Sequence, residues 1–312
     1  MIDHLETKVP IPGFTIGICA SDSADALPTL LRFLRSEDYG DGYKLRKVVV
    51  VASGCPESIT SEVRVMADSD ARITLIEESE RHGKAEAINR ILENSSGQYL
   101  IMLNADAFPD PGSIRKLLDI AGYSNVGAVS AMPVVQEGDG LLRRALALMW
   151  SAHSLMSLRL NHAGISNHAC DELIVIRRNL VSRLPTNVVN DGAYLGGLVR
   201  AQGFLVKFSK AAKVRIAVPR VLVDLIRQRR RIMFGHVQVW KKLGRPPRTI
   251  ESMLFMDPLV SLKTLVKVVS EKPRLIAAVP VVLTGESISG LMALVDVIRS
   301  TDRHTVWRRS VD

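Results

Sequence analysis

The sequence predicts an α/β fold in which a mostly parallel central sheet is flanked by helices. The first two-thirds of the chain alternates strand-like and helix-like segments, an order typical of such sheets. Several strand-like segments are continuous apolar runs, such as Lys47–Ala52 (KVVVVA) and Tyr99–Leu103, as in strands buried on both faces. Polar residues follow some of these runs directly, at the strand ends where ligands of parallel sheets bind.

The expected elements follow from these runs and from helical periodicity. Pro111 and Asp191 mark helix starts, because proline and acidic residues favour the first helical turn. The expected strands are Phe14–Ala20, Lys47–Ala52, Arg72–Ile76, Tyr99–Leu103, Val126–Val135, Glu172–Arg177, Phe204–Ser209 and Val214–Val218. The expected helices are Leu27–Leu34, Ser58–Met66, Ala85–Leu92, Gly112–Ile120, Leu141–Leu160, Asp191–Arg200 and Val221–Lys242.

Composition separates the two ends of the chain. The 312 residues are 47% hydrophobic and 23% charged, which excludes a disordered protein. Residues 1–199 contain 19 Lys and Arg against 24 Asp and Glu, whereas residues 200–312 contain 22 against 8. The basic half therefore either meets an anionic partner or is a solvated face. Three cysteines without metal-ligand spacing favour a reducing compartment, and we expect no secretory signal in Met1–Pro10.

The C-terminal segment, residues 244–312, is expected to be a helical tail distinct from the domain formed by residues 1–243. Asp257–Ser270 places apolar residues on one helical face and two lysines on another, a basic amphipathic pattern. Residues 275–298 are apolar and long enough to span a bilayer, but Glu286 lies at their middle. We interpret the tail as helices that lie on a membrane or pack on the first domain, with a single span as the less favoured alternative.

Asn104-Ala105-Asp106 directly follows the expected strand Tyr99–Leu103. A carboxylate at this position can hold a divalent cation that bridges the phosphates of a nucleotide diphosphate, and oxygen ligands suit Mg²⁺ or Mn²⁺. The alternative is an ordinary turn, since Asn, Asp and Pro are turn residues.

Two further sites lie at helix starts. Lys84 opens a helix after a glycine, where an anion can bind, although a solvated helix start explains these residues equally well. Asp191 can act as a general base toward an acceptor hydroxyl, or it can cap its helix.

The arginines of Gln228–Ile232 (QRRRI) cannot all face solvent on one helix, so some must point inward. A buried arginine requires an anionic partner, and a pyrophosphate would suit a guanidinium group. His236 lies one turn further along the same helix. Lipid head groups or nucleic acid are the alternative partners.

Taken in order, these segments resemble family 2 glycosyltransferases of GT-A fold. The resemblance covers about Phe14 to Trp240. The segments that carry it are FTIGICASDSADALPTLL from Phe14, VVVVASGCPE from Val48, GKAEAIN from Gly83, Leu100–Pro111 for the DxD segment, Val189–Gly192 for the ED segment, and Gln228–Ile232 for QxxRW. The sequence of Gln228–His236 further resembles an archaeal-like subgroup that acts at membranes.

The resemblance implies an inverting, metal-dependent transferase in which residues 1–243 form the glycosyltransferase domain. Asp106 would be the metal ligand for Mg²⁺ or Mn²⁺, and Asp191 the catalytic base. The donor-binding residues it implies are Ala20, Asp22, Ser53, Lys84, Asn104, Ala105, Gln228, Arg230, Arg231 and His236. The implied partners are a nucleotide-diphosphate sugar donor, a lipid-linked or glycan acceptor and an anionic membrane surface. We therefore expect a cytoplasmic protein peripheral to the cytoplasmic membrane.

Several positions depart from the family pattern. Asn104 replaces the first aspartate of DxD, Ile232 replaces the tryptophan of QxxRW, and Ala52 or Ser53 stands where the uridine-recognising aspartate is usual. Together with Ser23, these changes motivate the alternative of a non-catalytic binding protein for nucleotide sugars or polyanions on the same fold. The retained Asp191 favours the enzyme. The basic half lacks interleaved aromatic residues, so no nucleic-acid partner is expected.

Overall fold

The computed structural model describes residues 13–22, 24–136, 138–299, 301 and 304, and Met1–Pro10 and Ser23 lie outside them. The strands are β1 (Phe14–Ala20), β2 (Leu45–Ser53), β3 (Ile73–Glu78), β4 (Tyr99–Asn104), β5 (Ala107–Pro109), β6 (Val126–Val134), β7 (Leu173–Arg177) and β8 (Leu205–Ile216). The α-helices are α1 (Leu27–Ser36), α2 (Glu57–Ser69), α3 (Lys84–Asn94), α4 (Ser113–Ala121), α5 (Leu141–His162), α6 (Asp191–Ala201), α7 (Leu222–Leu243), α8 (Ile250–Met256), α9 (Pro258–Glu271) and α10 (Val279–Ile298). Two 3₁₀-helices, η1 (Arg178–Leu180) and η2 (Pro273–Ala278), complete them.

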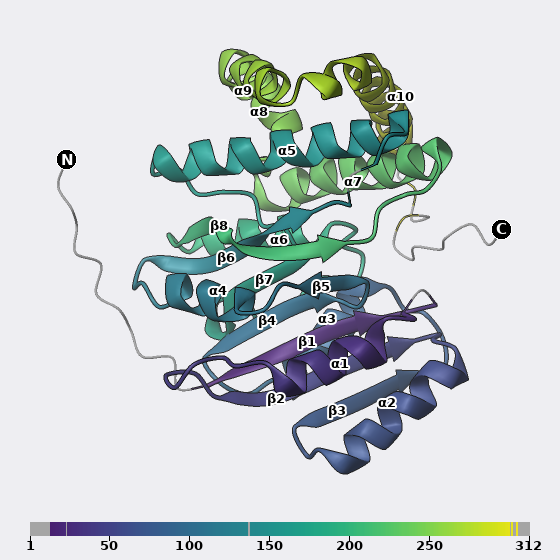
Figure 1. Cartoon of the computed structure of the whole chain (residues 1–312), viewed down its shortest axis with the longest axis vertical. Helices are drawn as coiled ribbons and strands as arrows, with labels where there is room; N and C mark the ends of the chain where they lie inside the picture. The colour runs from purple at the N-terminus through teal and green to yellow at the C-terminus, as the bar shows by residue number, and fades with distance from the viewer. Residues whose placement is uncertain (1–12, 23, 137, 300, 302–303, 305–312) are drawn as a thin grey trace.

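The strands form one sheet in the order β3-β2-β1-β4-β7-β6-β8-β5 (Figure 1). The first four strands in this order are parallel. β7 runs antiparallel to both β4 and β6, β8 is parallel to β6, and β5 is antiparallel to β8. The predicted α/β fold is confirmed, and the sheet is more mixed in its second half than in its first.

Helices bury both faces of the sheet because the strands carry apolar side chains on both. On β2, Val48 and Val50 face a core shared with α1, α2 and α4, whereas Val49 and Val51 face a core shared with α3, α6 and α7. All four valines are at most 1% exposed. Because successive side chains along a strand point to opposite faces, this valine run contributes to one hydrophobic core on each face of the sheet.

Three local expectations differ from the structure. The two short strands expected over 204–218 are one strand, β8, with a register shift against β6 between Ala131 and Met132. β5 was not expected; it pairs with the end of β8 immediately after the Asn104–Asp106 segment. α8 was also not expected, and it begins with a capping box between Thr249 and Ser252.

The tail helices α8, α9 and α10 cover α5 and α7 on the side away from the sheet (Figure 1). The carboxylates that counted against a membrane span are paired with arginines of α7. Arg229 donates to Glu286 at 2.7 Å and also pairs with Glu251, and Arg230 binds Asp296 through two hydrogen bonds of 2.5 and 2.6 Å. Pro273–Ile298 is long and apolar enough to cross a membrane by length and composition.

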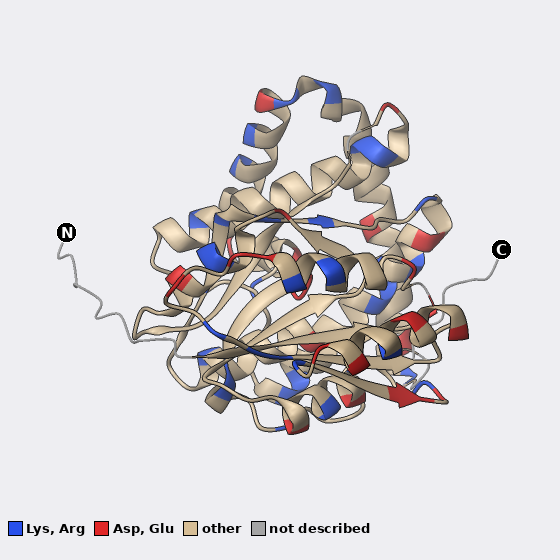
Figure 2. Ribbon diagram, turned by 60° about the horizontal axis from the view of Figure 1, so that its bottom comes forward, with Lys and Arg blue, Asp and Glu red and all other residues tan. Residues whose placement is uncertain are grey.

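α9 leaves part of its apolar surface exposed. Ser261, Thr264 and Val268 are buried, and Leu265 and Val269 pack on α5, whereas Leu259, Leu262 and Val266 are more than half exposed. The same holds along the rest of the tail; the exposed large apolar residues there are Leu254, Phe255, Met256, Leu259, Leu262, Val266, Ile276, Leu283, Ile288, Leu291, Leu294, Val295 and Ile298. Among the tail helices, α9 and η2 carry Lys or Arg, and the tail's basic positions are blue at the top of Figure 2.

Candidate active site

The candidate site lies at the edge of the sheet where parallel strands β1 and β4 end and antiparallel strand β7 begins. Cys19, near the end of β1, pairs in register with Asn104, the last residue of β4. Because β7 runs opposite to β4, Leu103 pairs with Leu173, and the two residues before β7 fall at this same edge. Strand direction thus brings Asp171 and Glu172 to the ends of β1 and β4.

Lys84 occupies the centre of the site. Gly83 adopts φ 94°, a conformation that favours glycine, and α3 starts at the next residue. The Lys84 Nζ lies 2.5 Å from Asp171 Oδ2 and 3.0 Å from Asp191 Oδ2. Burial opposes the ionisation of Asp171, but the ammonium group outweighs it and lowers the pKa of Asp171 to about 2. Lys84 therefore joins three segments that are far apart in the sequence.

Asp191 does not cap its own helix. The N-cap of α6 is Asn190, whose side-chain oxygen accepts a hydrogen bond from Ala193 N at 3.0 Å. Asp191 follows it in the first turn, with its side chain 7% exposed and directed to Lys84. Burial raises the pKa of Asp191 above its ordinary value, while Lys84 acts in the opposite direction. The carboxylate is free of the capping role and is available for chemistry.

Asn104 holds a second carboxylate, that of the half-buried Glu172. Its side-chain amide donates to Glu172 Oε2 at 2.9 Å, and its backbone N–H donates to Glu172 O at 3.3 Å. Burial and the neighbouring charges of Asp171 and Asp106 raise the pKa of Glu172 to about 8. Asp106 follows in the turn between β4 and β5, so the carboxylates of Asp106 and Glu172 face the same strand end.

Helix α7 closes the other side of the site through a close approach to α6. A methyl group at Gly235 would lie 2.6 Å from Cβ of Asn190, so only glycine fits there. One turn earlier, Arg231 donates to His304 O at 3.2 Å and lies within electrostatic reach of Asp191. Burial lowers the pKa of Arg231, although Asp191 and Asp171 act in the opposite direction. Arg231 is the arginine of α7 that the structure brings to Lys84 and Asp191.

The remaining predicted residues of α7 lie elsewhere around the helix. Arg230 turns to α10 and binds Asp296. Gln228 is half-buried on the same helix. The His236 ring lies 5.7 Å from that of His168, and burial lowers the pKa of His236 to about 4. A neutral imidazole can share a hydrogen bond with a phosphate but cannot offset its charge.

The residues expected to contact the donor base lie at the ends of β1 and β2. Ala20 ends β1 and is buried, as is Ala105 beyond β4. Asp22, in the loop after β1, accepts a hydrogen bond from Arg81 Nη1 at 2.9 Å. The Ser53 hydroxyl, at the end of β2, donates to Glu78 Oε2 at 2.5 Å. These residues share the strand-end edge, and the Arg81–Asp22 pair links the first loop to the segment before Lys84.

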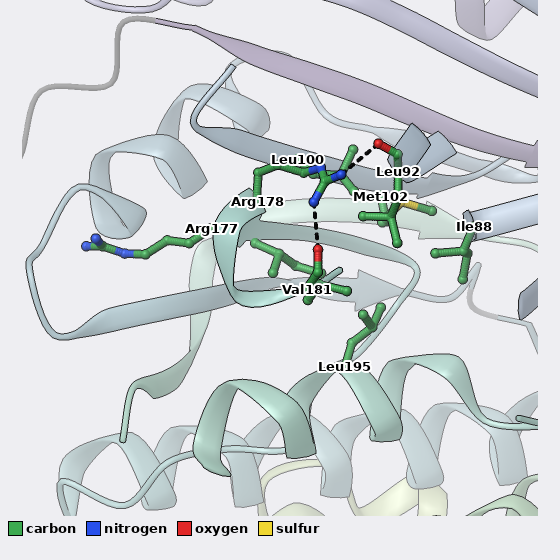
Figure 3. A pocket seen from close by; sticks show the side chains of 9 residues that line it. Ile88, Leu92, Leu100, Met102, Arg177, Arg178, Val181 and Leu195 are labelled. Atoms are coloured by element: carbon green, nitrogen blue, oxygen red, sulfur yellow. Dashed lines mark hydrogen bonds between the residues drawn. The ribbon is translucent and has the colours of Figure 1, made fainter. Parts of the chain in front are cut away.

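A separate apolar hollow lies between α3, β4 and the segment after β7 (Figure 3). Its lining includes Ile88, Leu92, Leu100 and Met102. Arg178 reaches across it and donates to the carbonyl oxygens of Leu92 and Val181, at 2.7 and 2.6 Å. None of the predicted site residues lines this hollow. It is a packing defect of the core and not part of the candidate site.

The donor set near Asp106 fits a divalent cation of the Mg²⁺ or Mn²⁺ type. Across the part of the chain that the structure describes, no group of three or more His, Cys, Asp or Glu side chains is arranged to hold a metal ion. Mg²⁺ in phosphate-transferring sites is held by one or two carboxylates together with substrate phosphates, so such a group is not required. Asp106 and Glu172 carry carboxylate oxygens, the kind of ligand that Mg²⁺ and Mn²⁺ favour.

Sequence reasoning missed Asp171 and Glu172. Two adjacent carboxylates directly before a buried strand were a usable signal, because Leu173–Ile176 are at most 1% exposed and such a strand leaves the preceding residues at the sheet edge. Their place beside Asn104 depends on β7 running antiparallel, which local sequence does not encode.

The sheet and its acid-rich strand ends are those of a GT-A nucleotide-sugar-binding protein. The family model of glycosyl transferase family 2 matches residues 15–184, more than half of the chain. The chain belongs to this family.

Curated relatives and solved structures agree with this assignment. Poly-β-1,6-N-acetyl-D-glucosamine synthase of Staphylococcus aureus is 19% identical over 202 residues, which are 63% of this chain and 49% of that protein. The chain thus spans about half the length of the curated relatives it matches.

Among solved structures, the mannosyltransferase PcManGT from Pyrobaculum calidifontis, in complex with GDP-Man and Mn²⁺, has a TM-score of 0.63 at 20% identity and covers 96% of this chain and 92% of its own. GalNAc-T7 with UDP, GalNAc and Mn²⁺ has a TM-score of 0.52 at 10% identity, over 74% of this chain and 48% of its own. At these identities the structural likeness establishes the fold.

Proposed function

We propose that this protein is an inverting glycosyltransferase that moves a sugar from a nucleotide-diphosphate donor to a hydroxyl or phosphate of a lipid or glycan acceptor at the cytoplasmic membrane face. The observation that carries the proposal is the convergence of Lys84, Asp191 and Arg231 beside the Asn104–Asp106 strand end. The complexes of similar proteins with GDP-Man or UDP and Mn²⁺ support a nucleotide-sugar donor and a divalent cation.

The reaction assigns one task to each side chain. Asp191 accepts the proton of the acceptor hydroxyl, and a raised pKa makes it a stronger base for that step. The acceptor oxygen then attacks the anomeric carbon, and the nucleoside diphosphate leaves from the opposite face. In this proposal, Lys84 and Arg231 bind the diphosphate, and Lys84 exchanges part of its contact with Asp171 and Asp191 for it. The divalent cation held by Asp106 would offset the charge on the leaving group.

The proposal predicts that loss of the Asp191 carboxylate lowers turnover but leaves donor affinity unchanged. A panel of UDP- and GDP-sugars, screened by thermal shift with and without Mn²⁺, identifies the donor because ligand binding stabilises the native state. Asp191→Asn is expected to keep donor affinity while lowering turnover by about 10²–10⁴-fold. Asp68→Asn, an exposed carboxylate on α2, is the control and retains full activity. Donor binding without any turnover in the wild type would instead indicate a non-catalytic sugar-nucleotide binding protein.

We assign the tail, residues 244–312, to membrane association. The apolar surface of α9 supports this, since Leu259, Leu262 and Val266 are more than half exposed. An exposed apolar surface flanked by Lys263 and Lys267 suits the interface of an anionic bilayer. The charged residues within α10 do not oppose it, because Glu286 and Asp296 are neutralised by arginines of α7.

Vesicle binding tests this assignment. The protein is expected to co-sediment with phosphatidylglycerol vesicles and less with phosphatidylcholine vesicles. Phe255→Glu with Leu291→Glu removes two exposed apolar residues and is expected to abolish binding. Val65→Glu, on α2 and 69% exposed, is the matched control. Equal binding by all three proteins would refute a role for the tail.

A further inference from the structure

Asn104 stands where the family pattern has an acidic residue, so β4 carries one carboxylate of the usual pair. The structure brings another carboxylate to the same place from the neighbouring strand. Glu172 lies opposite Asn104 at the β4–β7 edge, and the two residues are joined by side-chain and backbone hydrogen bonds of 2.9 and 3.3 Å. The acidic pair that the β4 segment lacks is therefore present in space.

Asn104 orients this carboxylate without neutralising it. The hydrogen bond comes from a neutral amide and uses Glu172 Oε2. The ammonium group of Lys84 is bound to Asp171 and Asp191 at 2.5 and 3.0 Å. A half-buried carboxylate in such surroundings is stabilised by a cation that arrives with the substrate.

We propose that Glu172 is the second protein ligand of the divalent cation, together with Asp106, and that Asn104 is the residue that positions it. Carboxylate oxygens are the ligands that Mg²⁺ and Mn²⁺ favour. A ligand held by an amide on the adjacent strand has the outer-shell support that metal sites require. The inference rests on the proposed function, because the cation serves a nucleotide-diphosphate donor.

The exchange of the two residues provides a direct test. Mn²⁺ affinity is measured from the electron paramagnetic resonance signal of free Mn²⁺, with GDP and separately with UDP present. Glu172→Gln is expected to weaken Mn²⁺ binding by about 10–100-fold. Asn104→Asp/Glu172→Gln keeps an amide–carboxylate pair with the partners exchanged, and it is expected to recover affinity to within about threefold of the wild type.

One control and one further variant complete the test. Glu62→Gln, an exposed carboxylate that pairs with Arg32 away from the site, is expected to leave the affinity unchanged. Asn104→Ala leaves the carboxylate in place and removes its support, so it tests the proposal even if Glu172→Gln fails to fold; it is expected to weaken Mn²⁺ binding by about tenfold.

Three results would overturn the inference or the proposed function. If Asp106→Asn loses Mn²⁺ while Glu172→Gln or Asn104→Ala binds it as the wild type does, Glu172 is not a ligand and the inference is overturned. If Glu172→Gln or Asn104→Ala lowers nucleotide affinity but leaves Mn²⁺ affinity unchanged, the inference is overturned as well. If the wild type binds no Mn²⁺ with either nucleotide, the proposed function fails instead.

Discussion

Replacement of Lys84 by methionine tests the electrostatic centre of the site. The substitution keeps the length of the side chain and removes the ammonium group that lies between Asp171 and Asp191. Removing one partner of a buried ion pair costs about 3–5 kcal/mol, and because Lys84 and Asp171 are 26% and 30% exposed we expect about 2–4 kcal/mol here. At about 2–4 °C per kcal/mol, the melting temperature should fall by about 4–16 °C.

The stability that Lys84→Met loses relative to the wild type should be larger at high pH than at low pH. Without the ammonium group, burial and mutual repulsion raise the pKa of both carboxyls in the folded state. A raised folded pKa penalises folding at high pH, and the penalty shrinks as pH falls through that pKa toward the unfolded value near 4. The difference in melting temperature between Lys84→Met and the wild type should therefore be larger at pH 8 than at pH 5.

Calorimetry at the two pH values measures this difference. Lys47→Met is the control, because the Lys47 ammonium donates to a neutral partner, the carbonyl oxygen of Asn94, at 3.4 Å. The double variant Lys84→Met/Asp171→Asn should recover part of the lost stability, since it removes one of the two repelling charges. The reasoning would be refuted if the melting temperature of Lys84→Met fell equally at both pH values. It would also be refuted if that decrease were no greater than the decrease for Lys47→Met.

Three further predictions concern other parts of the chain. Arg72 lowers the pKa of Asp70 to about 2, so Asp70→Asn should cost about 1–2 kcal/mol at pH 7 and progressively less as pH falls from about 4 to 2, as measured by urea unfolding. Arg229→Met leaves two tail carboxylates without their guanidinium partner; it should destabilise the tail by about 3–5 kcal/mol and expose residues 244–299 to limited proteolysis. Burial raises the pKa of Cys19 to about 12 and that of Cys170 well above its ordinary value, so both thiols should resist iodoacetamide at pH 8 until the protein is denatured.

Much of the fold was predictable because its strands are buried on both faces. In a run such as Val48–Val51, alternate side chains point to opposite faces of the sheet, so both faces must be covered. The unbroken apolar run therefore indicates a sheet between two layers of helices. β5 was missed because three residues carry no periodicity. β8 was divided in two because its middle, Lys210–Lys213, has the lysines of an exposed segment.

The site was predictable only in part. Lys84 and Asp191 were identified separately, from a helix start and an acidic residue after a loop, and the structure joins them through one contact. Whether Asp191 caps its helix could not be decided from sequence, since Asn190 next to it is an equally good cap. The positions of Asp171 and Glu172 depend on the direction of β7, a property of the whole sheet.

The arginines of α7 show the same limit. Sequence requires that some of Arg229, Arg230 and Arg231 point inward, but it does not say to which partner. The structure directs the first two to carboxylates of α8 and α10 and the third to the neighbourhood of Asp191. A single helix thus serves the tail on one side and the site on the other.

This arrangement sets how an acceptor can reach the enzyme. The absence of a side chain at Gly235 lets α7 touch α6 beside Asp191, and ion pairs fasten the same helix to α10. Asp191 and the tail proposed to bind membranes are therefore connected through one helix. Under the proposed function, a tail that rests on a bilayer would hold Asp191 at a constant height and tilt above it. An acceptor anchored in that bilayer would then search a plane and not a volume, and its reactive group would arrive from one side.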